Sequence, residues 1–219
     1  MRVAIAGAGK VGKSIARELV QNGHEVIVID RDPGEARPEA IPEARMILAD
    51  ACEATALEAA DLGSCQIMIA ATGDDKVNLV VSLLAKTEYG VPRVVARVNH
   101  PKNEWMFDET WGVDVAVSTP RIVAALVEEA VSVGDLVRLF QFRKGNAELV
   151  EITLAADSPV IGKRVDAITL PMDCSLVAIL RQSRVITPSP DDSLEIGDEL
   201  LFVSAVDQEV ALQQIFRRG

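Results

Sequence analysis

Short apolar runs alternate with amphipathic stretches through the first half of the chain. The apolar runs are rich in β-branched residues, which is typical of strands covered on both faces of a parallel sheet. They predict strands at residues 2–6, 25–29, 45–48, 66–71, 93–97 and 113–117. Helical spacing of apolar residues predicts helices at residues 11–22, 54–62, 75–89 and 102–111. Strands and helices that alternate in this order predict an α/β fold with a doubly wound parallel sheet.

One connection departs from this alternation. Pro33, Gly34, Pro38 and Pro42 fall where a second long crossover helix would normally follow the second strand. Proline has no N–H group, and its ring clashes with the preceding turn of a helix. We therefore expect a short helix or an irregular connection here, and right-handed crossovers elsewhere.

The connection between the first strand and the first helix reads Gly7-Ala8-Gly9-Lys10-Val11-Gly12. Gly7 allows a sharp turn, Gly9 lets a phosphate approach the backbone, and Gly12 lets the helix pack close to the strand. The N-terminus of that helix offers free N–H groups and a positive dipole end to the phosphate. Asp30 comes eighteen residues after Gly12, where a carboxylate can accept hydrogen bonds from ribose hydroxyls. These parts predict a Rossmann-like nucleotide-binding domain; the alternative is a fold of this type whose glycines serve only packing.

Further candidate contacts follow the other predicted strands, because the ligand of an open parallel sheet lies beyond the carboxyl ends of the strands. They are Asp50, Ala51, Thr72, Gly73, Asp74 and Arg97. The planar guanidinium of Arg97 would suit a phosphate, and its alternative role is a surface ion pair. Asp74 or Asp75 could simply cap the next helix, and Lys10 could be solvated instead of reaching a terminal phosphate. Asp30 would repel a 2′-phosphate, whereas Arg31 beside it could accommodate one.

The alternation ends near Ser118, Thr119 and Pro120, a typical start of a helix. Residues 121–133 have helical spacing and an unusually wide apolar face. That face must be buried somewhere, either on its own domain or on a second copy of the chain. We favour the second interpretation, a crossover helix that holds a homodimer together.

The remainder of the chain predicts a smaller α+β unit. Its expected strands lie at residues 136–142, 149–154, 176–181, 185–187 and 200–204, and its helices at residues 162–167 and 207–217. The predicted organisation is a nucleotide-binding domain at 1–117, a crossover and dimerisation helix at 118–135, and a C-terminal domain at 136–219.

Composition narrows the class of protein. The 219 residues are 49% hydrophobic and carry a net charge of −11, which disfavours a nucleic-acid surface and binding to an anionic membrane. No signal sequence precedes the first strand, and no apolar run approaches the roughly 20 residues that span a bilayer. We therefore expect a cytoplasmic protein with no membrane insertion of its own. The chain has three cysteines, an odd number, and no two of them have the spacing of metal ligands. We therefore expect all three to be reduced thiols.

A glycine loop of this kind is most often found in dehydrogenases. However, the chain has only two histidines, His24 and His100, and neither belongs to an evident acid–base constellation. No Ser/His/Asp set or metal-ligand cluster stands out. We expect no enzymatic activity, and a small NAD-dependent oxidoreductase is kept as the alternative.

The chain resembles the regulatory subunits of Trk/Ktr-type potassium uptake systems, which are built from RCK (regulator of potassium conductance) domains. The N-terminal motifs that carry this resemblance are the glycine loop, Asp30, Asp50-Ala51, Thr72-Gly73-Asp74-Asp75 with Asn78, and Ala96-Arg97-Val98. The C-terminal motifs are Val160-Ile161-Gly162-Lys163, Leu170-Pro171, residues 177–181, Thr187-Pro188 and residues 196–200. The C-terminal half discriminates, because the glycine loop alone would also suit any dehydrogenase.

The resemblance implies that the N-terminal domain binds NAD(H) or ATP/ADP. It also implies homodimers and higher rings on the cytoplasmic face of a membrane-embedded potassium-translocating subunit, with nucleotide exchange gating ion flux. The residues expected to contact nucleotide are 7–11, Asp30, Thr72, Gly73 and Arg97, with Asp50 and Ala51 near the adenine. Lys10 stands where ATP-sensing relatives can carry an arginine. A ligand-binding regulator of another cation transporter is the second alternative function.

Overall fold

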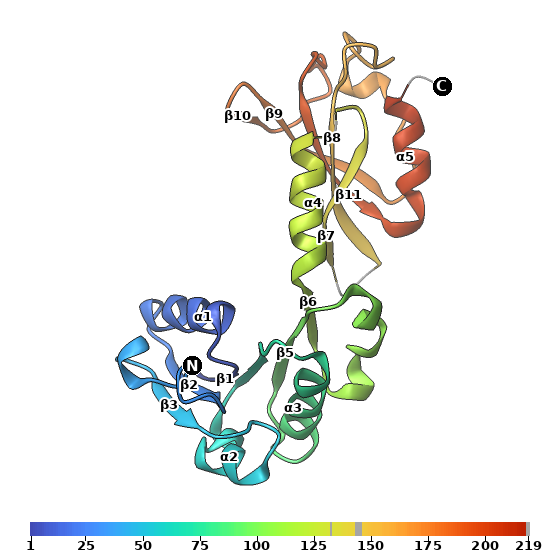
Figure 1. Cartoon of the computed structure of the whole chain (residues 1–219). Coiled ribbons are helices and arrows are strands. Elements are labelled where there is room, and N and C mark those ends of the chain that lie inside the picture. Colours follow the sequence, from blue (N-terminus) through green and yellow to red (C-terminus); the bar gives the residue numbers. More distant parts are fainter. Residues whose placement is uncertain (132, 143–145, 218–219) are drawn as a thin grey trace. The chain divides into compact units, whose positions relative to one another are not determined.

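The computed structural model describes residues 1–131, 133–142 and 146–217, which divide into two compact units, Met1–Pro120 and Arg121–Gly219. The first unit is built on a six-stranded parallel sheet in the order β3-β2-β1-β4-β5-β6. Its strands are β1 Arg2–Ala6, β2 Glu25–Asp30, β3 Arg45–Leu48, β4 Ile67–Ala70, β5 Arg93–Val98 and β6 Val115–Ser118. Its helices are α1 Lys10–Gln21, α2 Ala54–Ala59 and α3 Asp75–Thr87. The predicted doubly wound α/β fold is confirmed (Figure 1).

Alternate residues of each central strand enter two separate cores. On β1, Val3 and Ile5 pack with residues of α1 such as Ala16, whereas Ala4 and Ala6 pack with α2 and α3. Helices therefore cover both faces of the sheet, α1 on one face and α2 and α3 on the other (Figure 1). Because the strand order reverses between β1 and β4, the carboxyl end of β1 lies at a topological switch point.

The proline-rich connection after β2 contains only one short 3₁₀ turn, Pro38–Ala40, as expected. Two predicted helices are wrong. Residues 102–111 form two 3₁₀ turns, Pro101–Met106 and Glu109–Trp111, because the Asp108 side chain accepts hydrogen bonds from Thr110 and starts a new turn there.

The second wrong prediction is the helix at 162–167. Only Val165–Ala167 forms a 3₁₀ turn, while Gly162 has φ +75° and donates to the Leu194 carbonyl at 2.8 Å. The Leu194 N–H in turn donates to the Lys163 carbonyl at 3.0 Å, so this segment pairs across the fold instead of coiling.

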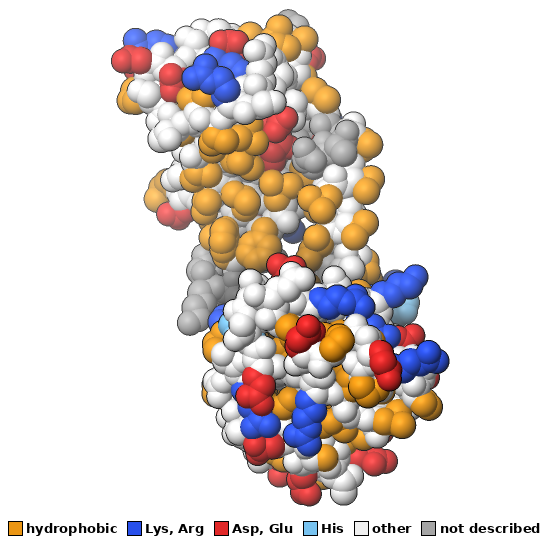
Figure 2. Space-filling view, turned by 90° about the vertical axis from the view of Figure 1, so that its left-hand side faces the viewer, with side chains coloured by type: hydrophobic (Ala, Val, Ile, Leu, Met, Phe, Trp, Pro, Cys, Tyr) orange, Lys and Arg blue, Asp and Glu red, His pale blue; other side chains and the backbone are white. Residues whose placement is uncertain are grey.

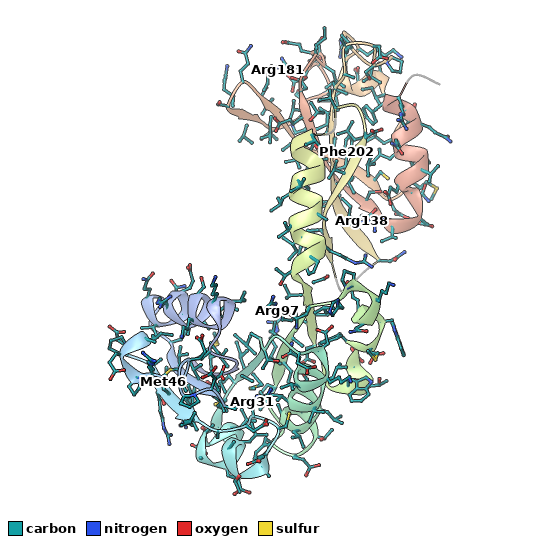
Figure 3. All side chains as sticks on the ribbon, viewed as in Figure 1. Arg31, Met46, Arg97, Arg138, Arg181 and Phe202 are labelled. Atoms are coloured by element: carbon teal, nitrogen blue, oxygen red, sulfur yellow. The ribbon has the colours of Figure 1, made fainter. Side chains whose placement is uncertain are left out.

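The second unit contains a five-stranded antiparallel sheet in the order β10-β9-β11-β8-β7. Its strands are β7 Leu136–Phe142, β8 Ala147–Thr153, β9 Cys174–Arg181, β10 Arg184–Ile186 and β11 Glu199–Ala205. Helix α5, Glu209–Phe216, covers one face of the sheet, where the rings of Phe202 and Phe216 lie 5.3 Å apart. At the end of β9, Arg181, labelled in Figure 3, donates to both carboxylate oxygens of the buried Asp198 at 2.7 and 2.8 Å.

Helix α4, Thr119–Val131, starts one residue after β6 and ends before the predicted boundary at 133; residue 132 lies outside the described residues. Its apolar side chains are unusually accessible, with Val123 55% exposed and Leu126 and Val127 each 57% exposed. Figure 2 shows hydrophobic side chains gathered on the face of the second unit that carries this helix. None of the described helices is both long and apolar enough to span a bilayer.

Candidate functional site

The glycine loop joins the carboxyl end of β1 to the start of α1, and its three glycines meet three different demands. Gly7 has φ +106°, and a Cβ there would lie 2.9 Å from the Thr72 nitrogen. A Cβ on Gly12 would lie only 1.9 Å from the Gly7 carbonyl oxygen. A Cβ on Gly9 would meet nothing within 4 Å. The outer glycines therefore permit close packing, whereas the middle one leaves open space at the start of the helix.

Gly9 is the N-cap of α1 and provides no side-chain hydrogen bond to the first turn. The N–H groups of that turn consequently have no capping side chain, and they add to the positive end of the helix dipole. This arrangement suits an anion that approaches over Gly9.

Asp30 connects the glycine loop to the end of β2. One of its carboxylate oxygens accepts from the Ala8 N–H at 2.5 Å, and the other accepts from the Asp32 N–H at 2.9 Å. Ala8 does not line the cavity described below, and it contributes instead by holding this carboxylate in place. Asp30 itself faces the cavity, where its remaining lone pairs can accept from hydroxyl groups.

A cavity of about 380 Å³ opens at the carboxyl edge of the sheet. The predicted site residues that line it are Gly7, Gly9, Lys10, Val11, Asp30, Arg31, Asp50, Ala51, Thr72, Gly73, Asp74 and Arg97. Of the predicted residues, only Ala8 and Gly12 are absent from the lining. The structure therefore brings together side chains that are dispersed over 91 residues of sequence, from position 7 to position 97.

Five lining residues were missed by sequence reasoning: Ile29, Asp32, Glu35, Ala71 and Val77. Asp32 and Glu35 belong to the irregular connection after β2, which has no periodicity to reveal where its side chains lie. Glu35 accepts from the Lys13 ammonium of α1 at 2.5 Å, and this ion pair fixes the connection against the helix.

The charged groups in the cavity differ in their partners. The Arg31 guanidinium lies 3.8 Å from Asp50, a loose and largely exposed pair. Asp74 caps α3 by accepting from the Lys76 N–H at 2.8 Å, as its alternative role predicted, while it also lines the cavity. By contrast, the Nε atom of Arg97 is buried without a hydrogen-bond partner among the described residues. Figure 3 labels Arg31, directly after β2, and Arg97, near the end of β5; the two strands lie on opposite sides of β1. Arg97 is the cation best placed to receive an anionic group.

None of the three cysteines, Cys52, Cys65 and Cys174, lines the cavity. Neither His24 nor His100 lines the cavity. Burial raises the pKa of the nearby Cys52 thiol, and the Asp50 carboxylate, which accepts from the Cys52 N–H at 2.9 Å, raises it further. The neutral thiol is a poor nucleophile. Within the described ranges, no group of three or more His, Cys, Asp or Glu side chains is placed to hold a metal ion.

Comparison with known proteins adds a family relationship to this geometry. The TrkA-N domain model matches residues 3–119, and the TrkA-C domain model matches residues 149–217. The chain is 58% identical to the Trk system potassium uptake protein TrkA of Mycobacterium tuberculosis (strain ATCC 25618 / H37Rv), with 98% of each chain covered. It is 31% identical to a TrkA homolog of Methanothermobacter thermautotrophicus, covering 100% of this chain and 99% of the relative.

Among solved structures, the GsuK channel matches with a TM-score of 0.70 and 17% identity, and so does the GsuK channel bound to NAD. Both matches cover 100% of this chain but only 40% of the GsuK chain, so the present chain spans less than half of those proteins. At this identity the likeness concerns the fold alone.

Proposed function

The chain belongs to the TrkA family, and from this membership we propose that it is a nucleotide-binding regulatory subunit of a potassium uptake system. Adenine nucleotide would bind in the cavity of the first unit and favour one conformation of the subunit. A ligand shifts such an equilibrium only by the difference in its affinity for the two states, so a tenfold bias requires about 1.4 kcal/mol. Nothing in this mechanism requires the nucleotide to be consumed.

The observation that supports the proposal best is the convergence of three features on one cavity. These are a helix N-terminus without a capping side chain at Gly9, a carboxylate held by the loop at Asp30, and the Arg97 guanidinium, whose Nε has no partner among the residues described. The first suits a phosphate, the second a ribose diol, and the third a further anionic group. Together they would suit a nucleotide with more than one phosphate.

We propose NAD(H) or ATP/ADP as the ligand. Solved relatives of this fold include GsuK bound to NAD, GsuK bound to ADP and a Kef C-terminal domain in an AMP-bound form. Nucleotides with a free 2′-hydroxyl should be preferred over NADP(H), because a 2′-phosphate would face Asp30 and the neighbouring Asp32 and Glu35. Arg31 would offset only part of this repulsion, because it is shared with Asp50 at 3.8 Å.

The partners follow from the same family membership. We propose a membrane-embedded, Trk/Ktr-type potassium-translocating subunit, which the protein would contact from the cytoplasm. The accessible apolar side chains of α4, including Val123, Leu126 and Val127, support assembly into a homodimer or a higher ring. Roughly 55–60% of the surface of a folded protein comes from apolar atoms, so scattered apolar side chains are ordinary. Several large ones on one helix face, however, form a patch that favours association.

Isothermal titration of the purified protein with NAD(H), ATP, ADP and NADP(H) tests the ligand. Gly9→Asp should abolish binding, because it places a side chain and a negative charge where phosphate must approach. Co-reconstituted with its transporter, this variant should associate but leave potassium flux unresponsive to nucleotide. Turnover of NAD(H) with a small metabolite would instead favour the oxidoreductase. A wild-type protein that acts on a different cation transporter would favour the second alternative.

A further inference from the structure

We propose that Asn78 is a positioning residue that sets the affinity of the cavity for the part of the nucleotide beyond its first phosphate. Asp75 extends the same hydrogen-bond network by holding the residues that follow β5. The proposal deepens the proposed function and rests on it, because it assumes that an adenine nucleotide occupies the cavity. Neither side chain lines the cavity, so both would act through the residues that do.

Asn78 lies in the first turns of α3 and is completely buried. Its side-chain oxygen accepts from the backbone N–H of Thr72 at 2.9 Å and from the Thr72 hydroxyl at 2.6 Å. Its side-chain nitrogen donates to the carbonyl of Thr72 at 3.3 Å and to the carbonyl of Arg97 at 2.9 Å. One amide thus joins the end of β4 to the end of β5, with both donors and its acceptor in use.

Asp75 extends the same network to the chain that follows Arg97. One carboxylate oxygen accepts from the Asn99 N–H at 2.6 Å and from its side chain at 3.0 Å. The other accepts from the His100 N–H at 3.0 Å and from the Asn103 side chain at 2.8 Å. The Asn99 side chain closes the network by donating to the Thr72 carbonyl at 3.1 Å. A buried polar network with so many satisfied groups is rigid.

The hydrogen bonds of Asn78 and Asp75 hold the ends of β4 and β5, on one side of the switch point. The cavity residues that follow β2 and β3 include Asp30 and Asp50, and their hydrogen bonds run to Ala8, Asp32 and Cys52. These residues, with the glycine loop, would hold the adenosine and the first phosphate. Thr72 and Gly73 follow β4, and Arg97 lies near the end of β5, on the other side of β1. The remainder of a diphosphate or dinucleotide would extend there.

If this is correct, the effect of losing Asn78 on affinity depends on the length of the ligand. If Asn78 is lost, Thr72 and Arg97 lose their shared partner, and among the described residues only the hydrogen bond from Asn99 to the Thr72 carbonyl still links these two strand ends. The contacts made by the second half of the ligand then weaken. AMP uses only the first half and should be little affected. A general loss of folding or of cavity shape would instead weaken AMP, ADP and NAD together.

The test is titration of AMP, ADP and NAD into wild type, Asn78→Ala and a matched control. Ser82→Ala is that control, because Ser82 is also fully buried on α3 and donates to the Asn78 carbonyl within the same helix. We expect Asn78→Ala to weaken ADP and NAD at least tenfold while AMP changes by less than about twofold. Ser82→Ala should leave the ratios of the three affinities unchanged.

Asn78→Asp keeps the acceptors that face Thr72 but loses both donors, and it should reproduce the length-dependent loss if the alanine variant folds poorly. Equal weakening of all three ligands, or unchanged ratios in both Asn78 variants, would overturn the inference. A wild-type protein that binds none of the three ligands would remove the proposed function itself, an outcome distinct from either of these.

Discussion

Gly9 and Gly12 should respond differently to the same substitution by alanine. In Gly12→Ala the new methyl carbon would lie 1.9 Å from the Gly7 carbonyl oxygen and 3.0 Å from the Gly7 carbonyl carbon. Both are backbone atoms, so no side-chain rotation can relieve the overlap. In Gly9→Ala the new carbon meets no atom within 4 Å, and the backbone at Gly9 has φ −68°, which alanine adopts freely.

These geometries set the magnitudes. Alanine is favoured over glycine inside a helix by about 1 kcal/mol, which would stabilise Gly12→Ala if packing allowed it. Relieving the contact with Gly7 requires a shift of about 1 Å between β1 and α1, and overpacking of a core costs about 1–3 kcal/mol or more. The packing penalty exceeds the gain in helix propensity, so we expect a net loss of about 2 kcal/mol. Gly9→Ala should be neutral or gain a few tenths of a kcal/mol from the less flexible unfolded chain.

Tryptophan fluorescence during thermal unfolding measures this directly, because both tryptophans, Trp105 and Trp111, belong to the first unit. At about 4 °C per kcal/mol, Gly12→Ala should lower the melting temperature by roughly 8 °C. Gly9→Ala should have the same melting temperature as the wild type. Its affinity for nucleotide should nevertheless fall at least tenfold, because the methyl group lies where the phosphate approaches. A Gly12→Ala protein as stable as the wild type would refute the packing argument, and an unstable Gly9→Ala protein would refute the open-space argument.

Two further predictions concern stability and assembly. Burial raises the pKa of Asp75, but hydrogen bonds from Asn99, Asn103 and His100 outweigh it, and the net pKa is lowered. A carboxyl whose pKa is lower in the folded protein stabilises the fold at pH values above its pKa in the unfolded chain. Asp75→Asn should therefore lower the free energy of unfolding by about 3 kcal/mol at neutral pH, and this loss relative to wild type should shrink below about pH 4. A loss that does not change with pH would contradict this reasoning. Leu126→Asp should leave each protomer folded, because the side chain is 57% exposed, but should shift sedimentation to smaller species, and a wild type that is already monomeric at micromolar concentration would end the dimer hypothesis.

The fold was predictable because its strands and glycine loop have local signatures. Apolar runs identify each parallel strand, and the spacing of Gly7, Gly9 and Gly12 follows from one tight turn into a helix. The 3₁₀ turns around Asp108 were not predictable from periodicity, because a single side chain that bonds its own backbone overrides an otherwise helical pattern. The same holds for Gly162, whose partner Leu194 is 32 positions away in the chain.

The site was predictable to a similar extent and for a similar reason. Strand ends are visible in sequence, so the positions from Asp30 to Arg97 could be selected one by one. Glu35 could not, because it reaches the cavity through an irregular connection that is held by Lys13. Asn78 had a faint signal, a polar residue among the apolar positions of a helix, but its four hydrogen bonds depend on two strand ends meeting in space.

An acidic protein with an acid-lined cavity must still attract an anionic ligand, and the distribution of charge explains how this is possible. Asp30, Asp32 and Glu35 lie on the β2 side, where neutral ribose hydroxyls would donate to them. The attraction for phosphate would come from the helix dipole at the start of α1 and from a few cations at fixed positions, Lys10, Arg31 and Arg97, and not from a general positive field. Recognition would therefore depend on which part of the ligand is charged. A phosphate in the chain between the two halves would meet donors, whereas the same group on the ribose would meet carboxylates.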